Sequence, residues 1–228
     1  MKIRADFSRK EVVGPNDALW VASPQPGVDR LMLDRIGDEI GRATSLVRFA
    51  SGSFFPFHEH GGGEEIFVLE GSLEDEHGTY PAGTYLRDPI GTSHQPFSKE
   101  GCLLFVKLWQ FAPQDRTRVV FDTKAGAWLN HAPIGPATKL LHEFGGEVTS
   151  LMLFPPGIQL ARHVHEVGQE LLVLEGTFSD ESGDYPKGTW IRFPAGSAHA
   201  PFSISGCTLL TKVGHLPVQR QDLTAPAL

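Results

Sequence analysis

Three histidines at a distinctive spacing carry the strongest chemical signal in this chain. His58 and His60 lie two residues apart, and His94 follows much later, just past a turn at Gly91. Because side chains of a strand alternate between its two faces, the first two imidazoles project to the same side and can share an ion. An antiparallel partner strand would bring His94 back beside them. Imidazole is a ligand for zinc, iron, nickel and copper, so the pattern indicates a transition-metal site.

The same three histidines recur 105 residues later, as His163, His165 and His199. A lone histidine is more often solvated, or hydrogen-bonded in a core, than bound to metal, but a set kept twice at one spacing favours metal binding. The duplication extends well beyond the histidines: residues 52–107 align without a gap on residues 157–212, and 27 of these 56 positions are identical. Such self-similarity indicates two copies of one structural module. We therefore expect two domains, 1–118 and 119–228.

Short apolar runs between turn-forming residues predict that each module is built from strands. Residues 65–71 and 170–176 are mostly apolar and end in glycine, as expected for strands buried on both faces. Turn signals of the Tyr-Pro-x-Gly and Pro-x-Gly types follow at intervals of about ten residues. The 17 prolines and 25 glycines are spread along the chain, which favours many short strands over helices. The fold class is therefore all-β, with modules that form sandwiches or closed barrels.

The two modules resemble the cupin superfamily. The first cupin motif combines a glycine, an H-x-H pair, a glutamate and a closing glycine, and it matches residues 52–71 and 157–176. The second motif is P-x-G-x-x-H, and it matches residues 89–94 and 194–199. The resemblance covers most of the chain and implies two tandem cupin barrels, also called double-stranded β-helix or jelly-roll barrels.

The resemblance also implies two sets of metal ligands. In cupins the metal-binding glutamate lies seven residues before the closing glycine, which favours Glu64 over Glu65 in the first module. The corresponding residue of the second module is Gln169, whose amide oxygen is a poorer ligand than a carboxylate. The second site would then be a three-histidine centre, a weaker or differently selective site, or empty, with Glu170 as a remote substitute. The implied ligands are His58, His60, Glu64 and His94 at site 1, and His163, His165, Gln169 and His199 at site 2.

Within the superfamily the chain looks like the ChrR-type cupins. It contains H-x-H-x-G-G-E-E, V-L-E-G, D-x-x-G-x-Y-P-x-G-T and H-x-P-x-S-x-x-G-C segments. That subgroup includes the metal-binding C-terminal domain of ChrR anti-sigma factors and, more distantly, acetylacetone-cleaving dioxygenases. An anti-sigma factor of this type also needs a zinc module with an H-x-x-x-C-x-x-C motif. The present sequence has no such motif, because Cys102 and Cys207 both lie inside the repeats.

Different functions are compatible with this resemblance. The first is a non-haem dioxygenase-type enzyme, in which a divalent ion of iron, zinc or nickel at site 1 acts on a small diketone-like substrate. The second is a ChrR-like sensor or regulatory protein of a transcriptional stress response, which would act through a separate partner. A closed structural zinc site would use the same ligands. A metal-free carbohydrate-binding or isomerase-like cupin ranks last, because such proteins commonly lose the ligand histidines.

Charge and composition narrow the range of partners. The formal net charge of −7 is spread without blocks of like sign, so neither nucleic acid nor an anionic membrane surface is an expected partner. A small-molecule ligand or substrate is expected, and a homodimer stays open. The N-terminus lacks an apolar run typical of a signal peptide, and no segment is apolar enough to span a membrane, so we expect a cytoplasmic protein.

Residues beside the first histidine set differ from their counterparts in the second. Ser93 and Gln95 flank His94 where the second module has alanines, and such polar groups favour site 1 as the working site. Three phenylalanines near His58 are expected in the core, with contact to a ligand pocket as the minor alternative: Phe54, Phe55 and Phe57.

Other side chains are interpreted as structural. Strand alternation points Arg162 away from the second site and towards solvent. The two cysteines are expected to pack as small apolar groups. Four unrepeated histidines are interpreted as surface residues: His77, His131, His142 and His215.

Overall fold

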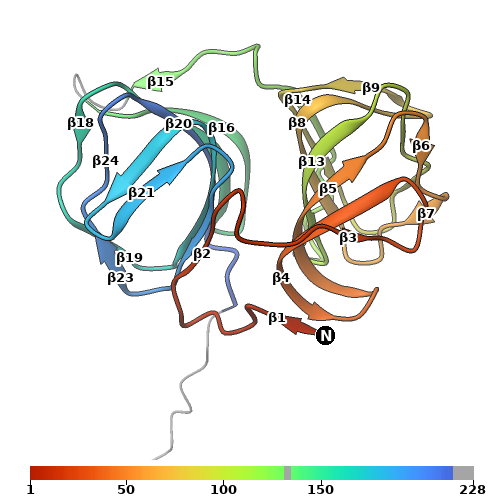
Figure 1. The fold of residues 1–228 in the computed structure, drawn as a ribbon, viewed down its shortest axis with the longest axis horizontal. Helices are drawn as coiled ribbons and strands as arrows, with labels where there is room; N and C mark the ends of the chain where they lie inside the picture. Colours follow the sequence, from red (N-terminus) through yellow and green to blue (C-terminus); the bar gives the residue numbers. More distant parts are fainter. Residues whose placement is uncertain (131–134, 218–228) are drawn as a thin grey trace, which may run out of the picture.

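The structure is a computed structural model that describes residues 1–130 and 135–217. These residues form strands, turns and bends without a helix. The strands build two barrels that lie side by side, one for each repeat (Figure 1). The predicted all-β fold of two tandem barrels is confirmed. Within the described residues there is no helix long and apolar enough to cross a membrane.

Barrel 1 holds the first histidine set. Its main sheet has the strand order β1, β4, β5, β13, β8, β10, β14, and the short strands pair on the opposite wall. The strands are β1 (Lys2–Ile3), β3 (Val21–Ala22), β4 (Val28–Gly37), β5 (Gly41–Phe49), β6 (Ser53–Phe54), β7 (His58–Glu59), β8 (Glu64–Asp75), β9 (Gly78–Pro81), β10 (Thr84–Asp88), β11 (Ser93–His94), β12 (Phe97–Ser98), β13 (Cys102–Leu108) and β14 (Val119–Asp122).

Barrel 2 repeats this plan with the second histidine set. Its main sheet has the order β15, β16, β17, β25, β20, β22, β2. The strands are β2 (Glu11–Val13), β15 (Leu129–Asn130), β16 (Ala137–Phe144), β17 (Glu147–Phe154), β18 (Ile158–Gln159), β19 (His163–His165), β20 (Gln169–Asp180), β21 (Gly183–Pro186), β22 (Trp190–Phe193), β23 (Ser197–His199), β24 (Phe202–Ser203) and β25 (Cys207–Val213).

The long strand β8 belongs to both walls of barrel 1. Its first half pairs with β10 and β13, and its second half pairs with β9 and β12. The change comes at Gly71, whose φ of 68° is left-handed and whose hydrogen faces the carbonyl oxygen of Gly101, only 2.0 Å from where a Cβ would lie. Glycine is required there because residues with a side chain rarely adopt this φ, and because an added Cβ would collide with that oxygen. The closing glycine of the sequence motif thus lets one strand bend around the barrel.

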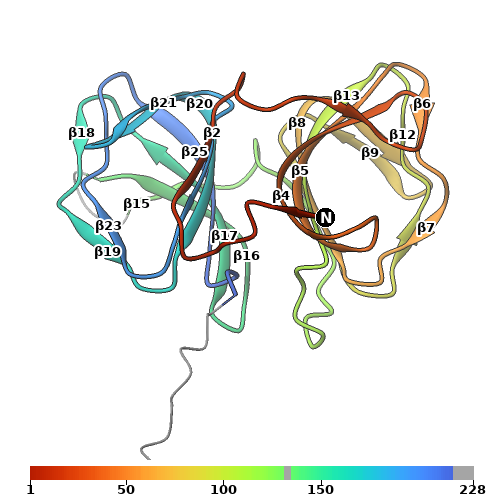
Figure 2. The ribbon, with the colours of Figure 1, turned by 60° about the horizontal axis from the view of Figure 1, so that its bottom comes forward.

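Each repeat contributes one strand to the main sheet of the other barrel. β2, from the N-terminal repeat, adds to barrel 2 and places Val13 opposite Trp190. β14, from the second repeat, adds to barrel 1 and places Phe121 opposite Tyr85, which is the position equivalent to Trp190. Figures 1 and 2 show the red β2 lying among the blue strands of barrel 2. The domain division after residue 118 stays a prediction, and the exchange means that each main sheet is completed by the other repeat.

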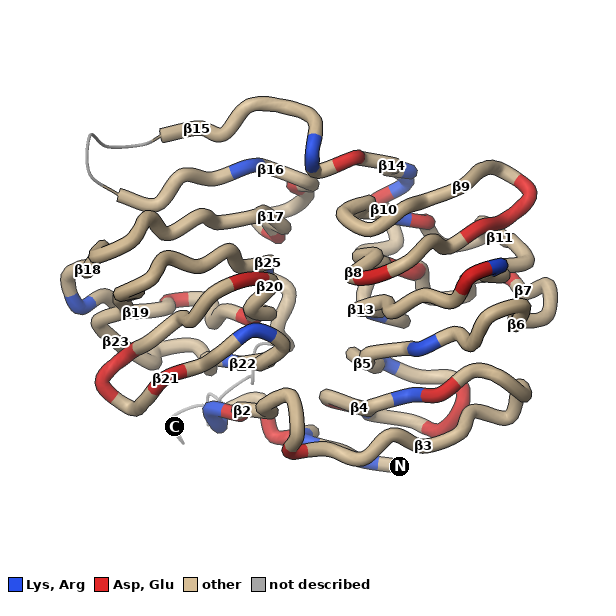
Figure 3. The backbone as a smooth tube through the Cα atoms, turned by 45° about the horizontal axis from the view of Figure 1, so that its top comes forward, with Lys and Arg blue, Asp and Glu red and all other residues tan. Residues whose placement is uncertain are grey.

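The main sheets of the two barrels pack against each other. One buried apolar cluster contains residues of both repeats, including Leu33 and Phe105 from barrel 1 and Leu141 and Leu210 from barrel 2. Charged residues of both signs also occur on the strands that face the other barrel (Figure 3). The interior of each barrel has an apolar cluster of its own.

Candidate metal centre

Barrel 1 brings the four predicted site 1 residues together. His58 lies on β7 opposite His94 on β11, and Glu64 begins β8 after a glycine loop that follows His60. One nitrogen or oxygen atom from each side chain lies within 4.8 Å of all the others. Oε2 of Glu64 is 3.2 Å from Nε2 of His60 and 3.3 Å from Nε2 of His94. Three imidazoles and one carboxylate therefore converge on a common point.

Hydrogen bonds orient all three imidazoles in the same way. Nδ1 of His58 is 2.9 Å from the carbonyl oxygen of Pro56, which can only accept, so Nδ1 donates. Nδ1 of His94 likewise donates to Oδ2 of Asp75 at 3.1 Å. The hydroxyl of Thr92 donates to the carbonyl of Pro89 at 2.7 Å, so it accepts from Nδ1 of His60 at 2.9 Å. In the neutral ring, a proton on Nδ1 leaves the Nε2 lone pair free for a metal.

The converging atoms have no ordinary hydrogen-bond partner. Nε2 of His60, Nε2 of His94 and Oε2 of Glu64 are buried and lack one. Buried polar groups are almost always paired, so three orphaned atoms at one point fit a cation between them. Burial alone would raise the pKa of Glu64, but the adjacent imidazoles of His60 and His94 lower it well below its usual range. The carboxylate is therefore ionised and ready to accept a divalent ion.

A cavity of about 490 Å³ opens beside this centre. It borders His58, His60 and Glu64, and Phe55 lines it, whereas Phe54 and Phe57 are exposed. Phe55 thus contacts the pocket, which was the minor alternative. The expected place in the core was wrong for Phe54 and Phe57. The deeper walls are apolar and include Val28, Val47, Phe49, Leu73, Leu104 and Val106. The volume is sufficient for a small organic molecule.

Trp109 lies at the rim of the cavity and was not singled out by the sequence. It adopts a left-handed φ of 59°, and its indole covers Gly62, where an added Cβ would meet the ring at 2.3 Å. The equivalent residue of the second repeat is Gly214, with a φ of 75°. A bulky residue in a conformation suited to glycine is strained, and such strain is concentrated at functional sites. A tryptophan in the first repeat at a position where the second repeat has glycine is the sequence signal that could have identified Trp109.

Barrel 2 brings its three histidines together without a carboxylate. One nitrogen from each of His163, His165 and His199 lies within 4.8 Å of the others. Nδ1 of His199 is 3.3 Å from Oδ2 of Asp180, but the Nε2 atoms of His165 and His199 hydrogen-bond each other at 3.0 Å. Burial lowers the pKa of His165 to about 4, with a further contribution from the other two histidines. The neutral imidazoles pair with each other, which competes with metal binding.

The surroundings of the second set are also more crowded. The ring of Phe193 stacks on His165 with centroids 5.1 Å apart and lies 4.5 Å from His199. The equivalent residue of barrel 1 is Asp88, which pairs with Arg118 at 2.9 Å.

Gln169 is the first residue of β20, as Glu64 is the first residue of β8. The metal role of both ligand sets stays a prediction, and the geometry is more favourable at site 1.

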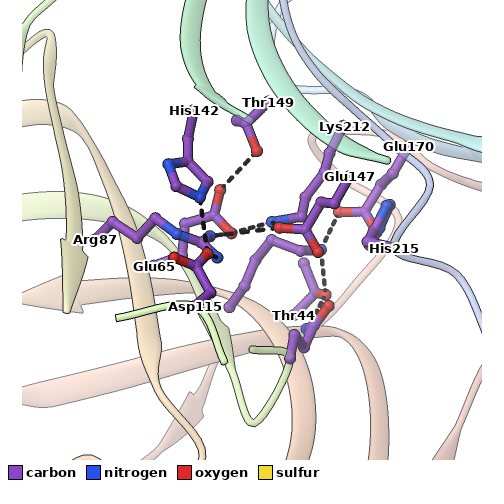
Figure 4. Close-up of polar contacts among 12 residues, drawn as sticks. Thr44, Glu65, Arg87, Asp115, His142, Glu147, Thr149, Glu170, Lys212 and His215 are labelled. Atoms are coloured by element: carbon purple, nitrogen blue, oxygen red, sulfur yellow. Dashed lines mark hydrogen bonds and ion pairs between the residues drawn. The ribbon is translucent and has the colours of Figure 1, made fainter. Parts of the chain in front are cut away.

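Glu65 and Glu170 belong to neither histidine set. Both lie in a cluster of polar side chains between the barrels (Figure 4). Strand alternation turns them towards the other barrel, where Glu65 pairs with Lys212 and Glu170 pairs with Lys107 at 2.5 Å. Burial would raise the pKa of Glu65, but Lys212 and Arg87 lower it to about 2. Because Glu170 is occupied at the interface, it does not substitute for the missing acidic ligand.

Two histidines interpreted as surface residues are instead buried between the barrels (Figure 4). Nε2 of His142 lies 2.8 Å from Asp115, and Nε2 of His215 lies 3.1 Å from Glu170. The interpretation was wrong because each imidazole is hydrogen-bonded to a carboxylate that is buried between the barrels. Among the other two, His77 has a side chain 47% exposed, as expected, and His131 lies outside the described residues.

The remaining structural interpretations agree with the structure. The side chain of Arg162 is 63% exposed and pairs with Glu181. Cys102 and Cys207 are buried, unpaired and part of the apolar clusters inside their barrels.

The two polar residues beside His94 have contacts of their own. Ser93 pairs with Glu59 across β11 and β7, and the main-chain amide of Gln95 donates to the carboxylate of Glu76. The hydrogen bonds that orient the site 1 imidazoles come instead from Pro56, Thr92 and Asp75.

The duplicated barrels can now be assigned to a family. The ChrR Cupin-like domain family matches the chain twice, over residues 8–112 and 116–217. The chain belongs to this family. The suspected bicupin is thereby confirmed, and each match contains one complete histidine set. No curated protein matches the chain.

Solved structures show the same two-barrel fold at low sequence identity. A candidate dioxygenase from Nostoc punctiforme has a TM-score of 0.76 and 15% identity, with 93% of this chain and 85% of that chain covered. The pirin YhhW from Escherichia coli, solved with nickel(II), has a TM-score of 0.67 and 13% identity, with 91% and 100% covered. Oxalate decarboxylase from Bacillus subtilis, which has Mn(II) centres, has a TM-score of 0.60 and 12% identity, with 91% and 78% covered.

Proposed function

We propose that the protein is a metal-dependent dioxygenase-type enzyme that acts on a small, diketone-like molecule in barrel 1. The observation that carries this proposal is the cluster of three imidazoles and Glu64, of which His58, His60 and Glu64 line a largely apolar cavity. A closed structural zinc site needs no adjoining cavity, whereas an enzyme needs room for substrate beside open coordination positions.

The residues of the centre fit a divalent ion and define what each would contribute. His58, His60 and His94 offer Nε2 lone pairs, and Glu64 offers one negative charge that offsets half of the ion's charge. Such an ion would supply Lewis acidity for a chelating substrate and, if it is iron, redox chemistry with dioxygen. Asp75 holds His94 in the required tautomer. The apolar walls exclude water and strengthen electrostatic interactions with a bound substrate.

The test combines metal content with oxygen uptake. Protein purified without added metal is analysed for iron, zinc and nickel, and oxygen uptake is then measured with 2,4-pentanedione and 2-hydroxyacetophenone. We expect His60→Ala to reduce uptake at least about 100-fold, because the substitution removes one of the four side chains that would hold the ion. The matched variant His165→Ala, in barrel 2, is expected to retain most of the uptake. Wild-type uptake no faster than that of His60→Ala would contradict the enzymatic function.

A ChrR-like sensor or regulatory role is the second candidate, supported by the family match itself. In that role the same metal centre would respond to an oxidant or ligand and change the contact of the protein with a separate partner. Affinity purification of the tagged protein with and without peroxide treatment tests it. Recovery of no regulatory protein under either condition would count against this role.

A further inference from the structure

Arg35 is a buried cation beside the cavity of barrel 1, and it has no carboxylate partner. It is 4% exposed and lines the cavity. Its Nε donates to the carbonyl oxygen of Asp38 at 2.8 Å, and its Nη2 donates to the same oxygen. In the described part of the chain, no carboxylate forms an ion pair with it. Burial lowers the pKa of its guanidinium, although Glu39 opposes this shift. A buried charge without a counter-ion is costly unless a ligand supplies one.

The sheet register places Arg35 and Glu64 on the same rung of barrel 1. Arg35 pairs with Ala43, Ala43 pairs with Leu108, and Leu108 pairs with Glu64. Directly paired residues of antiparallel strands project to the same face, so Arg35 and Glu64 point into one cavity. Three strand spacings separate their backbones by about 14 Å around the wall. One small molecule can therefore reach from the metal centre towards Arg35.

The arginine is specific to the repeat that has the complete ligand set. The same sheet position in barrel 2 is Glu143, which pairs with Val148 as Arg35 pairs with Ala43, and Glu143 is exposed. The equivalent hairpin turn there, at Gly145 and Gly146, closes without an arginine. The hydrogen bonds from Arg35 to the hairpin at Asp38 therefore do not by themselves explain why an arginine is buried at this position.

The charges that line the cavity favour a monoanionic ligand once a divalent ion is bound. Arg30 and Arg35 add two positive charges to those of the ion, and the acidic residues at the lining are Glu39, Glu59 and Glu64. Glu39 is already paired with Arg30 at 3.0 Å, and Glu64 belongs to the metal centre. With a divalent ion, the lining carries four positive and three negative charges, a net charge of +1, and Arg35 is the lining arginine that has no carboxylate partner among the described residues. The apolar walls and the indole of Trp109 provide contacts for the body of the molecule.

We propose that the cavity of barrel 1 binds a small organic acid with a flat apolar body, whose carboxylate pairs with Arg35 while its opposite end lies at the metal centre. The part of this inference that places the opposite end of the molecule at a metal ion rests on the proposed function. The recognition of the anion by Arg35 stands on the register, the burial and the charge alone.

The first test uses two fluorescent probes of one skeleton and no added metal. 1-Anilinonaphthalene-8-sulfonate carries a negative charge, and N-phenyl-1-naphthylamine is its uncharged counterpart. We expect Arg35→Gln to weaken binding of the anion at least tenfold and to leave binding of the neutral probe within twofold. Arg35→Lys should retain most of the anion affinity. The surface variant Arg48→Gln, which loses an exposed pair with Asp29 and a contact with the ring of Trp20, should change neither. Equal effects of Arg35→Gln on both probes, or none, would overturn the proposal.

The second test needs no variant and is therefore independent of whether Arg35→Gln folds. Zinc-loaded wild-type protein is titrated with benzoylacetone and with its para-carboxylated derivative, which share one chelating diketone. We expect the carboxylate to tighten binding at least tenfold, and equal affinities would overturn the proposal. If neither diketone binds while Arg35→Gln still weakens binding of the anionic probe, the proposed function fails and the anion site at Arg35 stands.

Discussion

At the scale of single residues, the centre of barrel 1 is set by groups that fix the tautomers of its ligands. Each imidazole donates from Nδ1 to an oxygen and directs Nε2 to the common point. Site 2 lacks one of these contacts: Ser197, the counterpart of Thr92, pairs with His165 across β23 and β19, but its hydroxyl donates to Pro194 and has no described hydrogen bond with the imidazole. The difference between the sites therefore includes more than the replacement of Glu64 by Gln169.

Thr92→Val tests the importance of this orientation. Valine has nearly the same shape but cannot accept the Nδ1 proton of His60, so the ring is free to rotate or change tautomer. We expect zinc affinity to fall about 10- to 100-fold, as measured by competition with a chromogenic chelator. The measurement uses a His165→Ala background, so that only site 1 is followed. Ser197→Ala in the reverse background, His60→Ala, is the matched control, and an equal loss in both would show that the hydroxyl acts on folding instead.

The cysteines give a second prediction at this scale. Burial raises the pKa of Cys102 to about 11 and also raises that of Cys207. The thiolate is the reactive form, and at pH 8 only about 0.1% of a thiol with such a pKa is ionised. We expect Ellman's reagent to react at least about 100-fold more slowly with native protein than with urea-unfolded protein, which should yield both thiols. Rapid reaction of one thiol in native protein would show that its barrel opens readily.

At the scale of elements, the sequence was sufficient where one local rule decides the outcome. Strand alternation predicted that His58 and His60 share a face, and the repeat predicted two equivalent barrels. The same alternation sends Glu65 to the opposite face from Glu64. Its partner Lys212 lies far away in the sequence, so this ion pair depends on how two complete barrels pack. His142 and His215 were misassigned for the same reason.

The strain at Trp109 and the position of Arg35 were also beyond a sequence argument. A left-handed φ is a property of the folded backbone, and in the first repeat no glycine marks it. The register of β4 contains an irregularity between Met32 and Asp34, which shifts the face of every later residue. Without that bulge, alternation along β4 does not predict that Arg35 faces the cavity.

Gly71→Ala tests the bend in β8. An added Cβ would meet the carbonyl oxygen of Gly101 at 2.0 Å in a backbone with a φ of 68°, so both strain and collision oppose it. Gly52→Ala is the matched control, because its φ is 74° and no atom lies within 4 Å of the added Cβ. We expect the control to lower the free energy of unfolding by about 1 kcal/mol and Gly71→Ala to lower it by at least about 3 kcal/mol in urea titrations. Equal losses would mean that the sheet yields around Gly71.

At the scale of the whole molecule, each barrel contributes matching elements to the other across their interface. Each lends a strand to the other, through β2 and β14. Each also contributes a buried lysine to an ion pair with the other. Lys107 of barrel 1 pairs with Glu170. The equivalent Lys212 of barrel 2 pairs with Glu65 (Figure 4). These glutamates directly follow Gln169 and Glu64, the first residues of their strands. Packing between the barrels therefore holds the strand that carries Glu64, the predicted acidic ligand of site 1.

Lys212→Met tests whether this buried pairing holds the barrels together as one cooperative unit. The substitution leaves Glu65 and Glu147 without the lysine that lies between them, and removing one partner of a buried pair typically costs about 3–5 kcal/mol. Lys187→Met removes an exposed pair with Glu175 and should change the free energy of unfolding by less than about 1 kcal/mol.

The second part of the measurement separates the two barrels. Tryptophan fluorescence follows Trp109 in barrel 1 and Trp190 in barrel 2, each isolated by replacing the other tryptophans with phenylalanine. Because the exchanged strands and the lysine pairs cross the interface in both directions, we expect both tryptophans to report one urea transition in the parent protein. Lys212→Met should shift both transitions to lower urea by the same amount. A shift confined to Trp190 would show that the barrels unfold independently and that the exchanged pairs contribute to orientation rather than to cooperativity.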